Sequence, residues 1–156
     1  MKKIWKFLSV LLMAQMILTS SMNVFAANVK NQEQINNGVK VNLLNENCYI
    51  ISAKGQMKRV TIVGNQVTLG IGEALVCPNY PVNAGQRIRV TWTLKQSGTI
   101  KVEMRKNSSL MGSSIVTGPS GYKYYTADVT TNYSVRFTNA QSSPLTITGA
   151  TMTWPA

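Results

Sequence analysis

The chain has 156 residues, with 16 Lys and Arg against five Asp and Glu, no histidine and two cysteines. Without histidine, neither a Ser-His-Asp triad nor a Cys-His pair can form, and two cysteines alone cannot complete a zinc site. The five acidic residues are too scattered along the sequence to predict a calcium site or the paired carboxylates of a glycosidase, so we expect no enzyme, no cofactor and no metal.

The first 26 residues have the pattern of a cleaved signal peptide. Three lysines among the first six residues precede a mostly apolar run over residues 7–18, and Val24-Phe25-Ala26 places small residues at the usual cleavage positions. The apolar run is too short for a retained membrane span. We therefore expect a secreted or cell-surface protein whose mature chain begins at Ala27, keeps 13 of the 16 basic residues and has a formal charge of about +8.

The mature chain is long enough for one domain and too short for two. Residues 27–38 are rich in Asn and Gln and are expected to form a flexible lead-in. Residues 39–156 alternate apolar and polar positions in short runs, with turn signals about every eight to twelve residues and no sustained helical period. This pattern predicts an all-β fold, a single antiparallel β-sandwich of the jelly-roll type, in preference to a closed barrel.

Cys48 and Cys77 lie in two apolar, strand-like runs in the first half of this domain. An even number of cysteines in an exported chain favours one disulfide. It would close a loop of about 30 residues and stabilise the fold by roughly 3 to 4 kcal/mol. The alternative is a pair of reduced thiols, buried as small hydrophobic side chains.

The strictest alternation lies in residues 86–105. The apolar positions of this stretch are Ile88, Val90, Trp92, Leu94, Ile100, Val102 and Met104. Between the two runs, Gln96-Ser97-Gly98 predicts a three-residue turn, because a turn of odd length keeps the apolar residues of both strands on one face. We therefore expect a β-hairpin in which Leu94 lies beside Ile100.

The outward positions of this hairpin are rich in cations. They are Arg87, Arg89, Lys95, Lys101 and Arg105. Strand alternation would gather them on one basic surface, suited to an anionic wall polymer, a glycan or a membrane surface. The alternative is a solvated face that only prevents edge-to-edge pairing of sheets. No specific nucleic-acid partner is indicated.

A second candidate surface is aromatic. Gly118-Pro119-Ser120-Gly121 is a strong turn signal, and the strand-like run that follows contains three tyrosines. Tyr122 and Tyr124 share one face and Tyr125 the other, so one set belongs to the core and the other could stack on sugar rings. Tyr80, on an expected proline-flanked loop over residues 79–84, is a further candidate. The alternative for all of them is cross-strand packing.

Of the last two predicted strands, only the second changes which alternate positions are apolar. Residues 131–138 place their apolar side chains on one face, whereas residues 145–154 change frame midway, which predicts a β-bulge at Gly149-Ala150. Trp92 and Trp154 fall on inward faces and are expected in the core.

Three segments carry a resemblance, namely Gly85-Gln86-Arg87-Ile88-Arg89-Val90, Asn132-Tyr133-Ser134-Val135-Arg136-Phe137 and Pro144-Leu145-Thr146-Ile147-Thr148-Gly149. With them, residues 85–154 resemble the small β-sandwich modules of exported Gram-positive proteins, such as the pre-peptidase C-terminal class. The resemblance implies a sandwich with an ancillary binding or surface role. The acidic loop residues common in such modules are missing from this chain, so no calcium or protease association follows.

These features predict a secreted, non-catalytic module that binds an anionic or saccharide component of the cell envelope. One alternative is a cationic toxin or antimicrobial that acts on membranes, although a long amphipathic helix is missing from the sequence pattern. Another is a surface structural protein whose edge strands pair with copies of itself.

Overall fold

The computed structural model describes residues 32–156, except positions 36, 37, 61 and 63. The predicted signal peptide therefore lies outside the described residues, as do residues 27–31 of the expected lead-in. The described residues from Glu33 to Ala156 belong to one compact unit.

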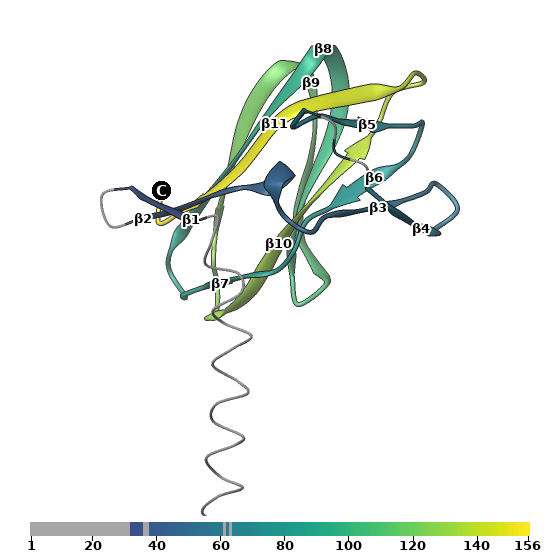
Figure 1. Cartoon of the computed structure of the whole chain (residues 1–156). Coiled ribbons are helices and arrows are strands. Elements are labelled where there is room, and N and C mark those ends of the chain that lie inside the picture. Colours follow the sequence, from purple (N-terminus) through teal and green to yellow (C-terminus); the bar gives the residue numbers. More distant parts are fainter. Residues whose placement is uncertain (1–31, 36–37, 61, 63) are drawn as a thin grey trace, which may run out of the picture. The chain divides into compact units, whose positions relative to one another are not determined.

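Strands dominate the described part of the chain, and Figure 1 labels them. In chain order the elements are β1 (Gln32–Ile35), β2 (Gly38–Asn42), the 3-10 helix η1 (Leu43–Asn45), β3 (Tyr49–Ile51), β4 (Met57–Arg59), β5 (Val67–Leu69), β6 (Ala74–Val76), β7 (Tyr80–Val82), β8 (Arg87–Lys106), β9 (Ser109–Thr126), β10 (Thr131–Asn139) and β11 (Leu145–Trp154). The pairings among β2 to β11 are antiparallel. Among these residues, no helix has the length and apolar composition that crossing a membrane requires.

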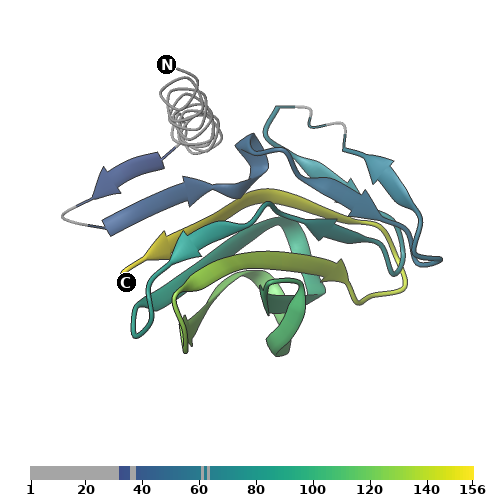
Figure 2. The same cartoon turned by 90° about the horizontal axis from the view of Figure 1, so that it is seen from below.

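The long strands β8 and β9 pair along most of their length as one two-stranded ribbon (Figure 1). Along its other edge, β8 pairs with β11 through residues 89–94 and with β10 through residues 100–106. The ribbon bends between these two halves, where its register shifts between Thr93 and Gly98. Two layers result: the first holds β2, β11 and one half of the ribbon, and the second holds the other half with β10, β6, β3 and β4. Figure 2 shows β11 and β10 one above the other.

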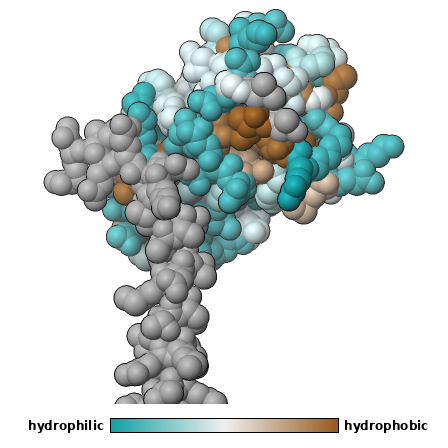
Figure 3. Space-filling view, in the orientation of Figure 1, coloured by the Kyte–Doolittle hydropathy of each residue, from teal (hydrophilic) through white to brown (hydrophobic). Residues whose placement is uncertain are grey.

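The inner faces of both layers meet in one hydrophobic core. Val90 and Met152 come from the first layer, Val102 and Phe137 from the second, and all four are 0% exposed. On the side of the molecule seen in Figure 1, polar residues cover most of the described surface around an apolar patch (Figure 3). Burying one face of each strand stabilises a sheet only when a second layer covers it, so the predicted antiparallel β-sandwich is confirmed.

Two predictions about strand faces are also confirmed. Trp92 and Trp154 are buried in the core. The register between β11 and β8 shifts between Ile147 and Gly149, which is the β-bulge expected from the change of frame.

The predicted hairpin at Gln96-Ser97-Gly98 is wrong. β8 continues through these residues, so Leu94 lies opposite Ile147 of β11, and Ile100 lies opposite Asn139 of β10. The chain bends instead of reversing, because β9 runs beside both halves of β8 and supplies their backbone hydrogen bonds.

The second predicted turn, at residues 118–121, is also part of a strand. Gly118 of β9 lies opposite Gly98 of β8, and Ser120 lies opposite Thr93. The two turn signals therefore mark the same bend in one ribbon, seen once from each strand. Glycine fits at both positions for different reasons. A Cβ atom added to Gly98 would lie 2.5 Å from Leu145 Cδ1, and Gly118 has a φ of +152°, which side chains rarely allow.

Two short strands occupy stretches that were expected to be irregular. β7 lies within the expected loop over residues 79–84 and pairs with the start of β10, and β1 lies within the expected lead-in. Both are too short for their alternation to be visible in the sequence. β1 lies beside the next strand, β2, whereas the partner of β7 is the distant strand β10.

Candidate functional site

Four of the eight predicted ligand-binding residues come together on the outer face of the first layer. They are Arg87, Arg89, Tyr122 and Tyr124, and we call them the Arg–Tyr face. The arginines alternate along β8 with Ile88 and Val90, which are fully buried, so strand geometry points both guanidinium groups away from the core.

The register of the ribbon places the tyrosines next to these arginines. Arg89 lies directly opposite Tyr124, whereas Arg87 and Tyr124, like Arg89 and Tyr122, are diagonal neighbours. The Arg87 guanidinium carbon lies 3.6 Å from the centre of the Tyr124 ring, and that of Arg89 lies 5.0 Å from the centre of the Tyr122 ring. These are cation–π distances, and they hold each guanidinium against a ring face. The two rings contact each other edge to face, with centres 5.5 Å apart.

Within the described residues, the positive charge of the Arg–Tyr face has no matching acid. Of the carboxylates in the described part of the chain, none forms an ion pair with Arg87 or Arg89. A guanidinium stacked on a ring keeps its in-plane N–H groups free to donate, and its fork matches the oxygens of a carboxylate or phosphate. The Tyr122 side chain is 59% exposed, so this ring also offers contact surface to a ligand.

Sequence reasoning missed the neighbours that extend this face across β11 and β2. Thr153 lies opposite both Arg89 and Lys40, so one row across four strands runs from Lys40 through Thr153 and Arg89 to Tyr124. In the next row, the hydroxyls of Thr91 and Thr151 are hydrogen-bonded at 2.6 Å. Alternation after the bulge gives the outward positions of β11, but only the register shows that they adjoin the arginines.

The remaining three cations of the predicted basic surface lie elsewhere. Lys101 belongs to the second layer and forms an ion pair with Glu103 at 3.2 Å. Arg105, in the same layer, donates from Nε and Nη2 to the carbonyl of Ser108. Lys95 is exposed at the bend. The expected single basic surface is therefore wrong, because the bend in β8 turns its two halves into opposite layers.

The proposal of Tyr80 as a ligand-binding residue is also wrong. Tyr80 is 1% exposed, and its ring packs against that of Trp154 with centres 5.7 Å apart. Burial raises the pKa of its hydroxyl well above the usual range. The side chain points inward because β7 alternates like any other strand, with Tyr80 and Val82 on the core side and Pro81 outside.

The predicted disulfide is not formed in the structure, where Cys48 and Cys77 are free thiols. They are nevertheless neighbours, since a hydrogen bond to the Cys48 thiol raises the pKa of Cys77 and burial raises it further. Both pack in or against the core, as the alternative of buried thiols describes.

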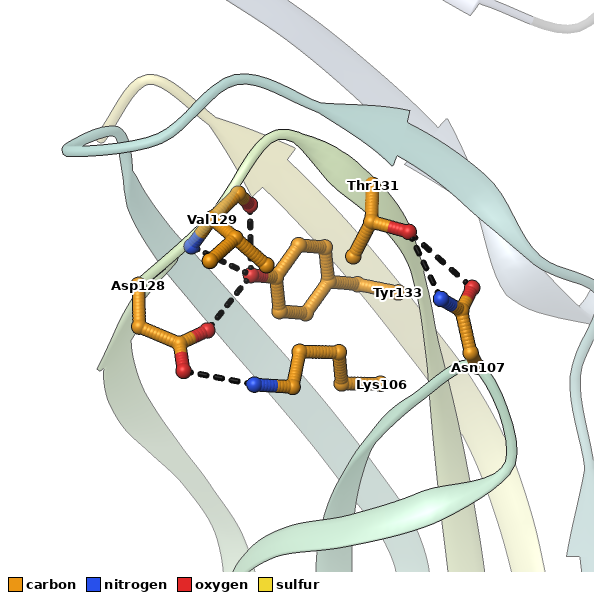
Figure 4. Close-up of polar contacts among 6 residues, drawn as sticks. All are labelled: Lys106, Asn107, Asp128, Val129, Thr131 and Tyr133. Carbon is orange, nitrogen blue, oxygen red and sulfur yellow. Dashed lines mark hydrogen bonds and ion pairs between the residues drawn. The ribbon is translucent and has the colours of Figure 1, made fainter.

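Three acidic side chains of the described chain have structural partners. Lys106 Nζ lies 2.6 Å from Asp128, whose second oxygen accepts a hydrogen bond from the Tyr133 hydroxyl at 2.9 Å (Figure 4). Glu73 pairs with Lys58 at 2.6 Å. Glu103 lies between Lys101 and Arg136. In the described residues, no three His, Cys, Asp or Glu side chains are placed to hold a metal ion.

No family model and no curated protein sequence matches the chain. The resemblance to the pre-peptidase C-terminal class therefore stays a prediction.

Solved structures are similar in part, at low sequence identity. A carbohydrate-binding module, CBM36, in complex with calcium and xylotriose aligns over 74% of this chain and 98% of its own, with 15% identity and a TM-score of 0.48. The C-terminal CBM6 of LamC, a marine laminarinase from Zobellia galactanivorans, aligns over 74% and 98%, with 10% identity and a TM-score of 0.42. A family two carbohydrate esterase from Cellvibrio japonicus aligns over 74% of this chain and 32% of its own, with 12% identity and a TM-score of 0.44. The chain thus spans about a third of that esterase.

Proposed function

We propose that this protein is a secreted, non-catalytic module that binds an acidic saccharide of the cell envelope through the Arg–Tyr face. One observation carries the proposal: two guanidinium groups, which have no carboxylate partner among the described residues, are held against two tyrosine rings on an exposed sheet face. The signal-peptide pattern of residues 1–26 supports the location.

Each residue type of this face suits one part of such a ligand. The open ring of Tyr122 offers an apolar, amphipathic surface for the C–H face of a sugar ring. Arg87 and Arg89 lie two residues apart on one strand face, about 7 Å, so they can contact acidic groups on neighbouring units of a polymer. Carboxylate and phosphate are the anions whose geometry matches the guanidinium fork.

The cation–π contacts also reduce the cost of binding. A free arginine side chain loses considerable rotamer freedom when a ligand immobilises it, at about 0.5 to 1.5 kcal/mol for each side chain. Arg87 is already held at 3.6 Å from the Tyr124 ring before a ligand arrives, so less freedom is left to lose. The threonine rows of β8 and β11 extend the face with short, hydrogen-bonding side chains.

The test is a binding series with purified cell walls and with soluble uronate-containing and phosphate-containing glycans, measured by sedimentation and calorimetry. We expect the double variant Arg87→Gln/Arg89→Gln to lose roughly tenfold or more in affinity, because two charge-assisted contacts are removed. Tyr122→Ala should weaken binding of neutral and acidic sugars alike. Raising the salt concentration should weaken the wild-type protein more than the double variant.

A matched control separates the Arg–Tyr face from net charge. Lys54→Gln/Arg59→Gln also removes two positive charges, but from other exposed positions. Lys54 lies just before β4 and Arg59 lies in β4, and neither residue is part of the Arg–Tyr face. This control should bind like the wild-type protein. Equal losses in both double variants would show that binding follows total charge, and the proposal would then be wrong.

A further inference from the structure

The register of β3 and β6 places the two cysteines opposite each other. Tyr49 of β3 pairs with Val76 of β6 in an antiparallel ladder. One step further along the same register, Cys48 faces Cys77. Residues directly opposite in antiparallel strands have Cα atoms about 4.5 to 5.5 Å apart, which falls within the separation of about 4.4 to 6.8 Å that a disulfide spans.

The backbone hydrogen bonds show which kind of opposite pair this is. Cys77 N–H donates to the carbonyl of Val135 on β10, at 3.0 Å, and therefore points away from β3. Cys48 N–H donates to the carbonyl of Glu46 at 2.7 Å. Neither N–H joins the two cysteines, so they form a non-hydrogen-bonded pair, the type in which opposite side chains lie closer together.

The side chains are positioned accordingly. The two thiols are hydrogen-bonded to each other, and the Cys48 thiol also donates to the carbonyl of Leu43 at 3.0 Å. Cys77 is 2% exposed, whereas Cys48 is half-buried at the edge of the core. A reagent in solvent can therefore reach Cys48 first.

We propose that Cys48 and Cys77 form a cross-strand disulfide when the protein meets a small-molecule disulfide such as oxidised glutathione. The Cys48 thiolate attacks one sulfur of glutathione disulfide and forms a mixed disulfide, and the departing glutathione thiolate takes up the proton that Cys48 lost. The Cys77 thiolate then attacks the Cys48 sulfur, and the second glutathione leaves and takes up the proton from Cys77. Both cysteines are oxidised, and one glutathione disulfide is reduced to two thiols.

The cross-link would join the segment after η1 to the end of β6, close to the core and apart from the Arg–Tyr face. It closes a loop of about 30 residues, and the chain-entropy model gives a decrease of the unfolding equilibrium constant by roughly 10² to 10³-fold. Oxidation should leave saccharide binding by the folded protein unchanged, so this proposal and the proposed function fail independently.

The experiment uses the full chain, reduced, then equilibrated with mixtures of oxidised and reduced glutathione and quenched with acid. Thiols are counted after unfolding, and peptides are identified by mass spectrometry. We expect no free thiol, a linked peptide pair containing Cys48 and Cys77, and a higher urea midpoint that dithiothreitol reverses. Two persistent thiols, or a stable glutathione adduct on Cys48, would overturn the proposal.

A register control keeps the test specific. Cys48→Ser/Tyr49→Cys moves one thiol to the adjacent position of β3, where alternation points it to the other face of the sheet. This variant should keep two free thiols under the same conditions. If it closes an intramolecular disulfide as readily as the wild-type chain, proximity alone explains the reaction and the register argument is wrong.

Discussion

Tyr133 is a fully buried residue with a polar role that its place in the sequence does not reveal. Its single O–H lies within donating distance of two acceptors, Asp128 Oδ1 at 2.9 Å and the carbonyl of Val129 at 2.8 Å, and its oxygen accepts from Val129 N–H at 3.3 Å (Figure 4). Alternation in β10 predicts that the ring faces inward. Alternation cannot predict that the Tyr133 hydroxyl reaches the turn between β9 and β10 and holds Asp128 beside Lys106.

This network and the Lys58–Glu73 ion pair make the free energy of unfolding depend on pH. The hydrogen bond from Lys106, followed by that from Tyr133, lowers the pKa of Asp128, and Lys58 with the N–H of Gly70 lowers that of Glu73. A carboxylate whose pKa is lower in the folded than in the unfolded protein stabilises the fold at pH values above its unfolded-state pKa. This contribution is lost as the pH falls through its folded-state pKa. The free energy of unfolding should therefore decrease below about pH 4.

Urea titrations between pH 7 and pH 2 measure this decrease. Asp128→Asn removes one of the two carboxylates whose pKa is lowered in the fold, so its stability should depend less on pH than that of the wild-type protein. At high pH, the hydrogen bond to Asp128 raises the pKa of Lys106. The contribution of charged Lys106 to the free energy of unfolding is therefore lost only above about pH 10.5. An unchanged acid slope in Asp128→Asn would contradict the assignment.

At the scale of elements, the bend in the β8–β9 ribbon decides the architecture. Gly121 of β9 lies opposite Trp92 of β8 next to this bend, and a Cβ atom added to Gly121 would lie 2.5 Å from Trp92 Cζ2. The indole is only 3% exposed and packs within the core. The glycine is therefore required for close packing of the ring on the β9 backbone.

We expect Gly121→Ala to destabilise the fold by roughly 1 to 3 kcal/mol, because overpacking displaces a rigid ring. Gly149→Ala is the matched control, since the nearest atom to its added Cβ is a Thr93 side-chain atom at 3.6 Å, an ordinary contact. It should change the free energy of unfolding by less than about 1 kcal/mol. Equal destabilisation in urea unfolding would show that the Trp92 contact is not responsible.

At the scale of the whole molecule, β9 leaves one edge of the sandwich open. In the described part of the chain, β9 pairs with β8 alone. Its inward residues Ser114 and Val116 are half-buried, whereas Val102 and Ile100 opposite them are fully buried. Residues 109–122 contain no charged side chain, and Ile115 is 68% exposed. An uncharged open edge can pair with a second copy without bringing like charges together.

We predict that the protein dimerises through residues 109–117 of β9, more readily at high salt because the net positive charge of the two copies is then screened. Sedimentation velocity over a range of concentrations, at low and high salt, measures this. Ile115→Lys places two positive charges at the paired edge and should restore the monomer. A constant monomer mass under all these conditions would rule out dimerisation.

Much of the fold and part of the site could be predicted from the sequence. The inward positions of β8, β10 and β11, the bulge near Gly149 and the fact that Tyr122 and Tyr124 share a face all follow from alternation, which is a local property of strands. Alternation does not say that this shared face points outward. The buried Asn139 could not be predicted. Its side-chain amide donates to carbonyls of Leu69, Gly70 and Ser143, partners that only the folded chain brings together.

The sequence by itself determined which side chains of the long strands β8, β10 and β11 face the core, the excess of cations and the absence of histidine. Only the tertiary structure decided that Gln96-Ser97-Gly98 bends a strand instead of closing a hairpin, that Arg87 and Arg89 meet Tyr122 and Tyr124, and that Lys101 lies in the opposite layer. The physical reason is that the side-chain period is set within each strand. Strand pairing instead depends on which distant segment offers the backbone hydrogen bonds.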